Sequence, residues 1–196
     1  MYVMPSLKSI ADDLKKPGAI AVIPTDTVYG VVARAADEAA VTRLYKLKDR
    51  HGKPGTLVAA SLEQLESIGL KHRYLKAVEQ FWPGALSVII PCADPALAYL
   101  HQGKMSLAVR IPDKKELQEL LQETGPLLTS SANHPAEAPA TTIQQAEDYF
   151  GKEVDAYFDG GDLSDHKPST ILRIIDDAIE IIRQGAVQID EEGHIK

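Results

Sequence analysis

The sequence predicts an α/β fold built on a sheet of mixed parallel and antiparallel strands. Short apolar runs typical of buried strands alternate with amphipathic helical segments for most of the chain, and this alternation is typical of the α/β class. Three strand-like runs follow one another closely, at residues 156–158, 170–175 and 179–183, which indicates that the sheet is not purely parallel. A chain of 196 residues, 44% of them hydrophobic and 25% charged, can bury one sizeable core. We expect a single domain over residues 1–196.

The first part of the chain predicts two helices around an apolar strand. Ser6 caps a helix over residues 7–14, because apolar residues recur there at helical spacing. A buried strand over residues 19–23 ends at Pro24, which has no N–H to continue a ladder. Asp37 caps a second helix that runs through Lys48.

The remaining elements continue the alternation. We predict further strands at residues 56–60, 86–90, 107–111 and 127–130, and helices at residues 61–67, 71–81, 113–122 and 142–150. Trp82-Pro83-Gly84 predicts a turn, and the polar, proline-containing stretch 131–141 predicts a loop. Residues 92–104 carry only a weak pattern.

Composition excludes several classes of protein. No apolar run approaches the roughly 18 residues needed to span a bilayer, and the first six residues lack the basic and then apolar pattern of a signal peptide. Cys92 is the only cysteine, which excludes an internal disulfide and a cysteine-built zinc site. We predict that Cys92 is a small buried residue rather than a nucleophile. The chain is therefore expected in the cytoplasm, with no membrane partner.

The net charge of −7 argues against nucleic-acid binding by the whole surface. The charge is unevenly placed, because residues 34–54 hold six basic side chains and three acidic ones, whereas the chain from residue 176 onward is acidic. A local basic segment in an acidic protein suits a small anion better than a long phosphate backbone.

Motifs of several familiar sites are missing from the sequence. It has no GxxxxGK[ST] phosphate loop, no GxGxxG fingerprint and no GxSxG nucleophile elbow. Its six histidines show neither an HExxH motif nor i,i+4 pairing, so we predict no metal site built by the protein.

Six polar clusters lie at the ends of predicted strands or helices, or in the loops that follow them. They are residues 25–29, Lys48 to Lys53, Ser106 with Arg110, residues 129–133 with Thr141, residues 160–161 with 168–171, and Arg183 to Gly185. Turn formation explains several of them equally well, and helix C-terminal cations explain Lys48 and Arg50. Together, and without a protein nucleophile, they favour binding of a polyanion and an amino-acid-like molecule, with catalysis by orientation and charge stabilisation.

Two of these clusters carry a geometric argument. Ser106 and Arg110 are an even number of residues apart, so they share one face if residues 107–111 form a strand. Lys48 and Arg50 would diverge on a regular helix, but in a loop they can hold one anion from two sides.

In chain order the clusters form one longer pattern. It runs through Pro24-Thr-Asp-Thr-Val-Tyr-Gly30, Lys48-x-Arg50, Trp82-Pro-Gly84, Val109-Arg-Ile-Pro112, Ser131-Ala-Asn133, Asp159-Gly-Gly161, Ser169-Thr-Ile171 and Arg183-x-Gly-Ala186. The pattern covers nearly the whole chain and resembles the YrdC/TsaC family of threonylcarbamoyl-AMP synthases, in its short single-domain form. The resemblance implies a twisted mixed sheet flanked by helices around a concave basic cavity.

The resemblance also implies a reaction. L-threonine, bicarbonate and ATP, with Mg²⁺, would give threonylcarbamoyl-AMP and pyrophosphate. Partner proteins of tRNA modification would then pass the threonylcarbamoyl group to an adenosine of tRNA. The resemblance leaves room for direct contact between this protein and tRNA. The nucleophile in this chemistry is derived from the substrate, so the protein need not supply one.

Site residues are implied position by position. The resemblance gives Lys48 and Arg50 catalytic roles on the phosphates or bicarbonate. Threonine would be bound by Thr27, Tyr29, Arg110, Ser131 and Ser169, with Arg110 on its carboxylate. The nucleotide would be bound by Arg50, Lys53, Ser106, Asn133, Thr141 and Arg183.

The chain departs from the family pattern in several places. His51 follows Arg50 where proline is usual, Ala85 and Ser87 replace proline and threonine, and Asp113 follows the VRIP motif. The glycine usual after the SAN motif is also absent. Two alternatives therefore stay open at this point: a YciO-like paralogue with an altered reaction, and a protein that binds double-stranded RNA or tRNA in the same concavity.

Overall fold

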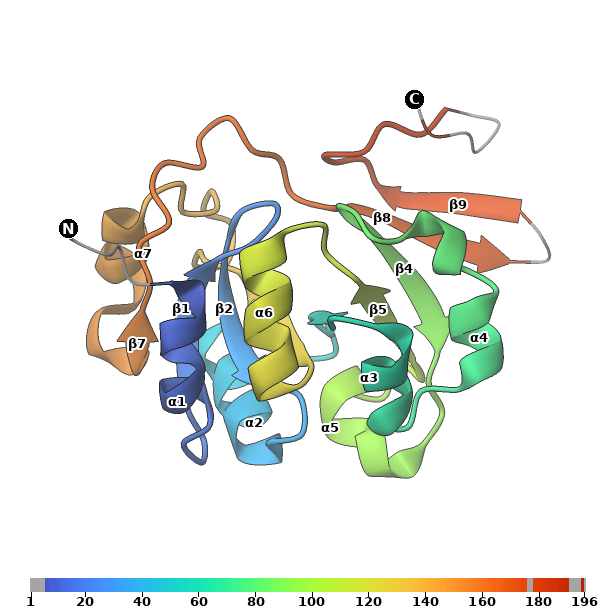
Figure 1. Cartoon of the computed structure of the whole chain (residues 1–196), viewed down its shortest axis with the longest axis horizontal. Helices are drawn as coiled ribbons and strands as arrows, with labels where there is room; N and C mark the ends of the chain where they lie inside the picture. The colour runs from blue at the N-terminus through green and yellow to red at the C-terminus, as the bar shows by residue number, and fades with distance from the viewer. Residues whose placement is uncertain (1–5, 176–177, 191–194, 196) are drawn as a thin grey trace.

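All strands in the described part of the chain belong to one twisted sheet. The structure is a computed structural model, and it describes residues 6–175, 178–190 and 195. The nine strands lie in the order β7-β1-β2-β6-β3-β5-β4-β8-β9 (Figure 1). Their bounds are β1 Ile20–Pro24, β2 Tyr29–Arg34, β3 Thr56–Val58, β4 Leu86–Pro91, β5 Ser106–Arg110, β6 Leu127–Ser131, β7 Ala156–Tyr157, β8 Thr170–Ile175 and β9 Ala178–Arg183.

The sheet is mixed, as predicted. Strands β1 and β7, β3 and β5, and β4 and β8 pair in parallel, whereas the other neighbours pair antiparallel. The closely spaced strands near residue 175 contribute one antiparallel pair, because β8 and β9 form a hairpin added to the β4 edge.

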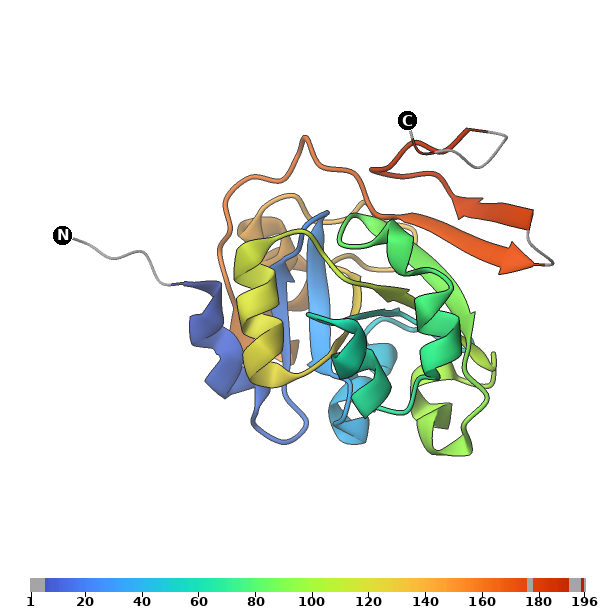
Figure 2. The ribbon, with the colours of Figure 1, turned by 45° about the vertical axis from the view of Figure 1, so that its right-hand side comes forward.

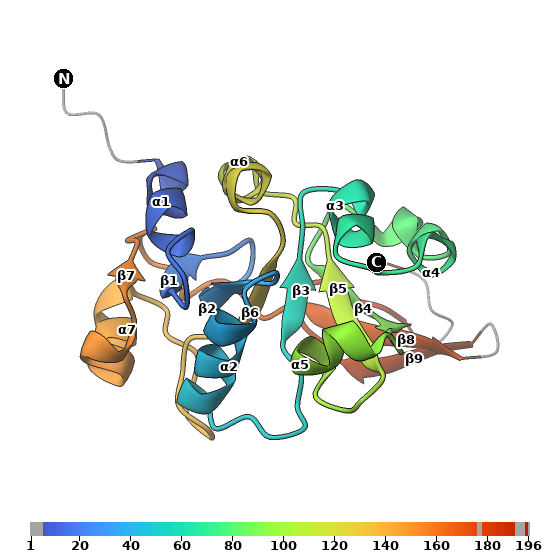
Figure 3. The ribbon, with the colours of Figure 1, turned by 90° about the horizontal axis from the view of Figure 1, so that it is seen from below.

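Helices cover both faces of this sheet. Seen from below, α1, α6, α3 and α4 lie on one side and α2, α5 and α7 on the other (Figure 3). Their bounds are α1 Ala11–Leu14, α2 Glu38–Leu47, α3 Leu62–Ser67, α4 His72–Lys76, α5 Ala98–His101, α6 Lys115–Thr124 and α7 Ile143–Phe150. Four short 3-10 segments complete the set of described helical elements: Leu7–Ile10, Glu79–Phe81, Pro95–Leu97 and Gly151–Glu153.

Two apolar clusters hold the layers together. The smaller one packs α1 and α6 against the sheet through residues such as Leu14, Leu117 and Leu121, all of them buried. The larger one joins the sheet to the remaining helices and includes Leu44 of α2, Leu100 of α5 and Phe150 of α7. The one continuous sheet therefore has an apolar core on each of its faces, and the single domain over residues 1–196 stays a prediction.

Strand β2 is the main element that the sequence analysis missed. The stretch after Pro24 was expected only as a turn or half of a site, but the chain turns over Thr25–Val28 and returns as β2, antiparallel to β1. The hydroxyl of Thr25 accepts from the Thr27 amide at 3.1 Å and donates to the Val28 carbonyl at 2.7 Å. Threonine hydroxyls thus close the turn locally, and the two apolar runs pair across it.

The predicted helix over residues 71–81 was wrong in its length. The chain forms α4 over His72–Lys76 and then a separate 3-10 turn over Glu79–Phe81. Between them Val78 has φ −124°, outside helical geometry. A β-branched residue close to Pro83 explains why the helix does not continue.

Most other predicted elements are present within a residue or two. Ser6, Asp37, Ser61 and Thr142 accept backbone N–H groups as the N-caps of their helical segments. Cys92 is buried, and no described helix has the length and apolarity needed to cross a membrane. Residues 1–5, on which the expectation about a signal peptide depends, and most of the acidic segment after residue 190 lie outside the described residues.

The β8–β9 hairpin projects from one end of the sheet (Figures 1 and 2). Its inner strand pairs with β4 over Leu86–Ile89 and Thr170–Arg173. The loop leading into β8 brings Ser169 next to β4 and β5, and the end of β9 brings Arg183 there too. The hairpin therefore supplies one wall of the cavity described next.

Candidate active site

A cavity of about 450 Å³ lies where the β1–β2 turn, strands β4, β5 and β6, and the β8–β9 hairpin meet. Five cationic side chains line it: Arg50, Lys104, Arg110, Arg173 and Arg183. Among the described residues on its wall there is no aspartate or glutamate. A wall with this charge is suited to an anionic ligand, although the whole chain has a net charge of −7.

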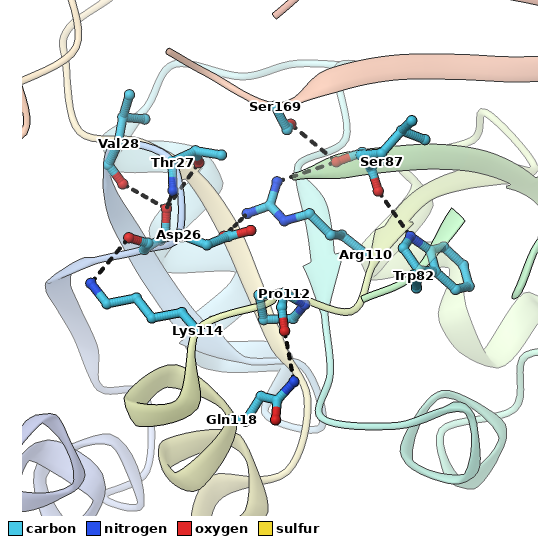
Figure 4. A network of polar contacts seen from close by, with 12 residues as sticks. Asp26, Thr27, Val28, Trp82, Ser87, Arg110, Pro112, Lys114, Gln118 and Ser169 are labelled. Atoms are coloured by element: carbon cyan, nitrogen blue, oxygen red, sulfur yellow. Dashed lines mark hydrogen bonds and ion pairs between the residues drawn. The ribbon is translucent and has the colours of Figure 1, made fainter. Parts of the chain in front are cut away.

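Arg110 forms the floor of the cavity near the β1–β2 turn. It is the last residue of β5, and its side chain is 3% exposed. One Nη donates to Asp26 at 3.0 Å and the other to the Ser87 hydroxyl at 3.3 Å (Figure 4). Ser106 lines the same cavity from the same face of β5, as the even spacing predicts. Arg110 keeps a planar fork with further N–H groups for a bound carboxylate.

Asp26 is a buried residue beside the cavity to which the sequence analysis gave no role in the site. It was expected only to shape the turn, yet its carboxylate is 6% exposed and forms a buried ion pair with Arg110. Burial raises the pKa of the Asp26 carboxyl, and the positive charges of Arg110 and Lys114 oppose that shift. Oδ2 of Asp26 and Nε of Arg110 are both buried without a hydrogen-bond partner among the described residues. The sequence held one signal for this role of Asp26, a carboxylate placed in the turn directly after a buried strand.

A chain of hydroxyl contacts links Arg110 to the far wall. The Ser87 hydroxyl, on β4, donates to the Ser169 hydroxyl at 3.0 Å (Figure 4). Arg183 also contacts Ser169: its Nη2 donates to the Ser169 carbonyl at 2.7 Å and to the Ser169 hydroxyl at 3.1 Å. Burial, together with the positive charges of Arg110 and Arg50, lowers the pKa of Arg183. The guanidinium groups of Arg110 and Arg50 are therefore close enough to Arg183 to affect its protonation.

Arg50 is held by its own loop. Its guanidinium donates to the carbonyls of Lys53 at 2.9 Å and Pro54 at 3.2 Å, and to the Ser130 hydroxyl at 2.8 Å. Burial lowers the pKa of Arg50, but an arginine stays charged in proteins. These bonds to neutral oxygens orient the positive charge and leave it without a carboxylate among the described residues.

Thr27 and Tyr29 lie at the turn end of the cavity. Thr27 contacts the Thr25 hydroxyl at 3.0 Å and lines the wall. The Tyr29 hydroxyl donates to the Gly161 carbonyl at 2.9 Å and accepts from the Gly160 amide at 2.8 Å. Tyr29 thus ties the Gly160-Gly161 segment to the turn. Gly160 has to be glycine here, because a Cβ would lie 2.4 Å from Pro24.

Lys48 faces the Ser131–Thr141 loop rather than the cavity wall. Its amine donates to the Asn133 carbonyl and, at 3.1 Å, to Oδ1 of the same residue. Burial, and to a lesser extent Arg50, lowers the pKa of Lys48 from 10.5 to about 8. Oδ1 of Asn133 also accepts from the Ser131 hydroxyl at 2.6 Å. In this conformation Lys48 positions the loop that carries Ser131.

The structure brings together most of the residues singled out in the sequence. Those on the cavity wall are Thr27, Tyr29, Arg50, Ser106, Arg110, Ser131, Ser169 and Arg183. Lys48, Lys53, Asn133 and Thr141 do not line it; Lys53 and Asn133 contact wall residues, and Thr141 bonds to Gln145. The catalytic role expected of Lys48 stays a prediction, as do the nucleotide contacts expected of Lys53, Asn133 and Thr141.

The wall does not fit a resident divalent metal ion. It offers hydroxyl and carbonyl oxygens but, among its described residues, no carboxylate, whereas Mg²⁺ in proteins usually takes one or two carboxylates. No group of three histidine, cysteine, aspartate or glutamate side chains gathers anywhere in the described part of the chain. An Mg²⁺ ion would have to arrive with the phosphates of a ligand.

A cavity lined by cations and by neutral hydroxyl groups suits the binding of a small anion, or a transferase reaction that works by orientation. The Sua5/YciO/YrdC family model, described as telomere recombination, matches residues 13–185. This chain therefore belongs to the Sua5/YciO/YrdC family.

Three relatives place it more closely. A Methanocaldococcus jannaschii protein is 33% identical over 193 residues, which cover 94% of this chain and 89% of the relative. The threonylcarbamoyl-AMP synthase of Vibrio vulnificus is 29% identical, with 92% of this chain and 98% of that protein covered. The crystal structure of P. abyssi Sua5 complexed with L-threonine superimposes with a TM-score of 0.80 at 26% identity, covering 92% of this chain. The chain spans 54% of the length of that Sua5 chain.

Proposed function

We propose that this protein is an L-threonylcarbamoyladenylate synthase, a nucleotidyltransferase that makes threonylcarbamoyl-AMP and pyrophosphate from L-threonine, bicarbonate and ATP. The observation that carries the proposal is the buried Arg110, held between Asp26 and Ser87 on a wall that also presents Thr27, Ser131 and Ser169. Relatives of nearly the same length carry that enzyme name, and the threonine-bound Sua5 structure has the same fold.

The geometry supports one end of the cavity as the threonine site. The Arg110 fork can pair with the α-carboxylate bidentately. Hydroxyls of Thr27, Ser131 and Ser169 surround it and can bond to the amine and the side-chain hydroxyl. Tyr29 shapes this end by holding the Gly160-Gly161 segment.

The other cations suit the triphosphate. Arg50 and Arg183 are fixed by hydrogen bonds to neutral oxygens, so their charge is free to stabilise phosphate groups. Ser106 lies beside them on β5. Lys48, Lys53, Asn133 and Thr141 do not line the cavity, and we expect them to act on the nucleotide or its phosphates from beside it.

The chemistry then needs orientation rather than a protein nucleophile. The threonine amine attacks bicarbonate, water leaves, and a carbamate forms. A carbamate oxygen attacks the α-phosphorus of ATP, and pyrophosphate leaves. Guanidinium groups fixed before the reaction would stabilise the charge that moves to the leaving phosphates. Mg²⁺ would enter as part of MgATP, consistent with the absence of carboxylates from the described wall.

The wider role follows from the product. Threonylcarbamoyl-AMP is an activated acyl donor, so a separate transferase of the tRNA-modification system would consume it to modify an adenosine. We expect this in the cytoplasm. Direct contact with tRNA is not needed for the proposed reaction, and the net charge of −7 disfavours it.

The test is a product assay with the purified full chain. The protein is incubated with ATP, Mg²⁺ and bicarbonate, together with L-threonine or its isostere L-valine, and pyrophosphate and the acyl-adenylate are quantified. We expect product with threonine and at least about a hundredfold lower kcat/KM with valine, because valine leaves the hydroxyl-binding groups unpaired. Absence of the acyl-adenylate with threonine, in protein that binds ATP, would overturn the proposal.

A further inference from the structure

The four arginines of the cavity fall into two groups according to what their side chains are paired with. Arg110 pairs with Asp26 and Arg173 pairs with Glu180, at 3.0 Å and 2.6 Å. Arg50 and Arg183 donate to carbonyls and hydroxyls instead, and neither forms an ion pair with a carboxylate among the described residues. The positive charge is therefore neutralised at the Arg110 end and uncompensated at Arg50 and Arg183.

Asp26 acts on the ligand through Arg110 and not by contact. It does not line the cavity, whereas its neighbours Thr25 and Thr27 do. Its Oδ1 fixes one Nη of Arg110 from behind (Figure 4). The pair is almost fully buried, with both side chains no more than 6% exposed. A charge in such surroundings acts on its neighbours with little screening.

We propose that Asp26 is a specificity-determining, positioning residue: it reserves Arg110 for a single carboxylate and turns phosphate groups away from that end of the cavity. The inference rests on the proposed function, in which Arg110 receives the threonine carboxylate and Arg50 and Arg183 receive the phosphates. It explains how two anionic substrates find separate places in one cation-lined cavity.

The physical reason lies in how the two anions bind. A carboxylate gains two parallel hydrogen bonds from the part of the Arg110 fork that Asp26 and Ser87 leave open. A phosphate chain owes more of its affinity to net charge, and Asp26 offsets the charge of Arg110. The negative charge of Asp26 therefore disfavours a polyanion more strongly than a monoanion, while Arg50 and Arg183 attract the polyanion to the other end.

The wild-type protein tests the proposal without any substitution. The Kd of L-threonine is measured by calorimetry in acetate and, separately, in inorganic pyrophosphate, at constant ionic strength and with no divalent metal. We expect acetate to raise the apparent Kd of threonine competitively, and pyrophosphate to leave it within about twofold while still competing with ATP. Competition of pyrophosphate with threonine in the wild type, as strong as that of acetate, would overturn the inference.

Asp26→Asn tests the cause. The amide oxygen can still accept from Arg110, so the orientation is kept and only the charge is removed. In D26N we expect saturating pyrophosphate to raise the apparent Kd of threonine by roughly tenfold, because Arg110 now carries an uncompensated charge. A D26N protein that folds and shows no such competition contradicts the inference.

Glu180→Gln is the matched control. It makes the same carboxylate-to-amide change beside another cavity arginine, Arg173, at the far end of the wall. We expect pyrophosphate to compete with threonine no better in E180Q than in the wild type. Equal competition in E180Q and D26N would mean that net charge, and not Asp26, is responsible. A wild type that binds ATP but no threonine would refute the proposed function itself, which is a different outcome from each of these.

Discussion

Two buried cations of this protein are stabilised in different ways. Arg110 has a carboxylate beside it, whereas Lys48 contacts the carbonyl and side-chain oxygens of Asn133 and the ring of Phe150, none of which carries a negative charge. A buried ammonium without a counter-ion loses its proton more readily, and the pKa of Lys48 falls from 10.5 to about 8. The guanidinium of Arg110 keeps its charge under all ordinary conditions. Of these two cations, only Lys48 therefore couples its protonation to the stability of the fold, at pH values around 8 and above.

The first prediction concerns stability against pH. Between pH 8 and 10.5 the unfolded chain holds a proton on Lys48 that the folded chain has lost, so this group makes the folded state more stable as pH rises through that window. Lys48→Met removes the effect. We expect the stability difference to shift in favour of the wild type, by on the order of 1–2 kcal/mol, between pH 7.5 and 10. Urea unfolding at both pH values measures it.

Lys46→Met is the control for this prediction. Lys46 belongs to the same helix, α2, and is exposed. The difference between K46M and the wild type should be the same at pH 7.5 and pH 10. A pH-independent difference for K48M as well would show that Lys48 keeps an ordinary pKa.

The second prediction concerns Ser87, whose hydroxyl joins Arg110 to Ser169. Ser87→Ala removes an acceptor and a donor from a fully buried position, which costs about 1–3 kcal/mol of stability. Because Ser87 positions two residues of the proposed threonine site, KM for threonine should rise several-fold while KM for ATP stays within about twofold. Steady-state kinetics with each substrate varied in turn measures the split.

Ser87→Thr is the conservative partner of that variant. Threonine is the usual residue of the family pattern at this position, and it keeps the hydroxyl. We expect S87T to restore the threonine KM of the wild type. A rise in both KM values for S87A, or a failure of S87T to restore binding, would show that Ser87 supports the fold and not the site.

The types of residue and their order along the chain were enough to predict many of the residues that line the cavity. Thr27, Tyr29, Arg110, Ser131 and Ser169 all line it, and each lies at or close to one end of a strand within a recognisable motif. Asp26 was missed because the sequence does not show which cation a turn carboxylate will meet. That contact joins the β1–β2 turn to β5, and it depends on strand order rather than on local spacing.

At the scale of secondary-structure elements, the β8–β9 hairpin is attached to the sheet through close backbone contacts. Gly185, just after β9, lies so near the loop before β8 that a Cβ would come within 2.2 Å of the Pro168 carbonyl oxygen. The Gly185 amide donates to the Thr170 hydroxyl at 2.9 Å. This contact sets the distance between the end of β9 and Ser169, and so the place of Arg183.

The third prediction follows from that contact. Gly185→Ala forces backbone to move in the loop that carries Ser169, and we expect a loss of about 2 kcal/mol or more of stability. Gly84→Ala is the control, since a Cβ at Gly84 would meet its nearest atom, the Phe81 carbonyl oxygen, only at 3.8 Å; it should cost within about 1 kcal/mol. Equal losses in the two variants, measured by urea unfolding, would mean that the hairpin tolerates the displacement.

Elements with strong local signals were predicted well, and those decided by pairing were not. Helix α2 begins at its Asp37 cap and ends at Lys48 as the sequence indicates. Strand β2 was missed because Gly30 interrupts its apolar run. The structure shows why a glycine is required: a Cβ there would lie 2.6 Å from the Thr129 hydroxyl oxygen on the neighbouring strand β6.

At the scale of the whole molecule, a net charge of −7 coexists with a cavity whose charged wall residues are all cationic. The cationic cavity attracts a compact anion over a short range, whereas a long polyanion would also meet the acidic surface. This contrast separates the proposed enzyme from the RNA-binding alternative, which the named relatives do not favour.

The fourth prediction uses that contrast. Raising NaCl from 50 to 500 mM should weaken ATP binding by about tenfold or less, because the cavity partly shields its charges. Unmodified tRNA should bind with a Kd weaker than about 10 μM at 150 mM NaCl. Calorimetry with ATP and fluorescence anisotropy with labelled tRNA give the two measurements. Tight tRNA binding that falls with a slope of about −5 or steeper against log salt would favour the RNA-binding interpretation.

The residues that line the cavity come from widely separated parts of the chain. They extend from Thr25 in the β1–β2 turn to Arg183 at the end of β9. During synthesis the β1–β2 hairpin leaves the ribosome early and can pair at once, but Arg110, Ser169 and Arg183 arrive much later. Non-local contacts of this kind form slowly. A nascent or truncated chain that lacks the β8–β9 hairpin therefore lacks one wall and cannot trap a reactive acyl-adenylate, so binding competence reports that translation has passed this hairpin.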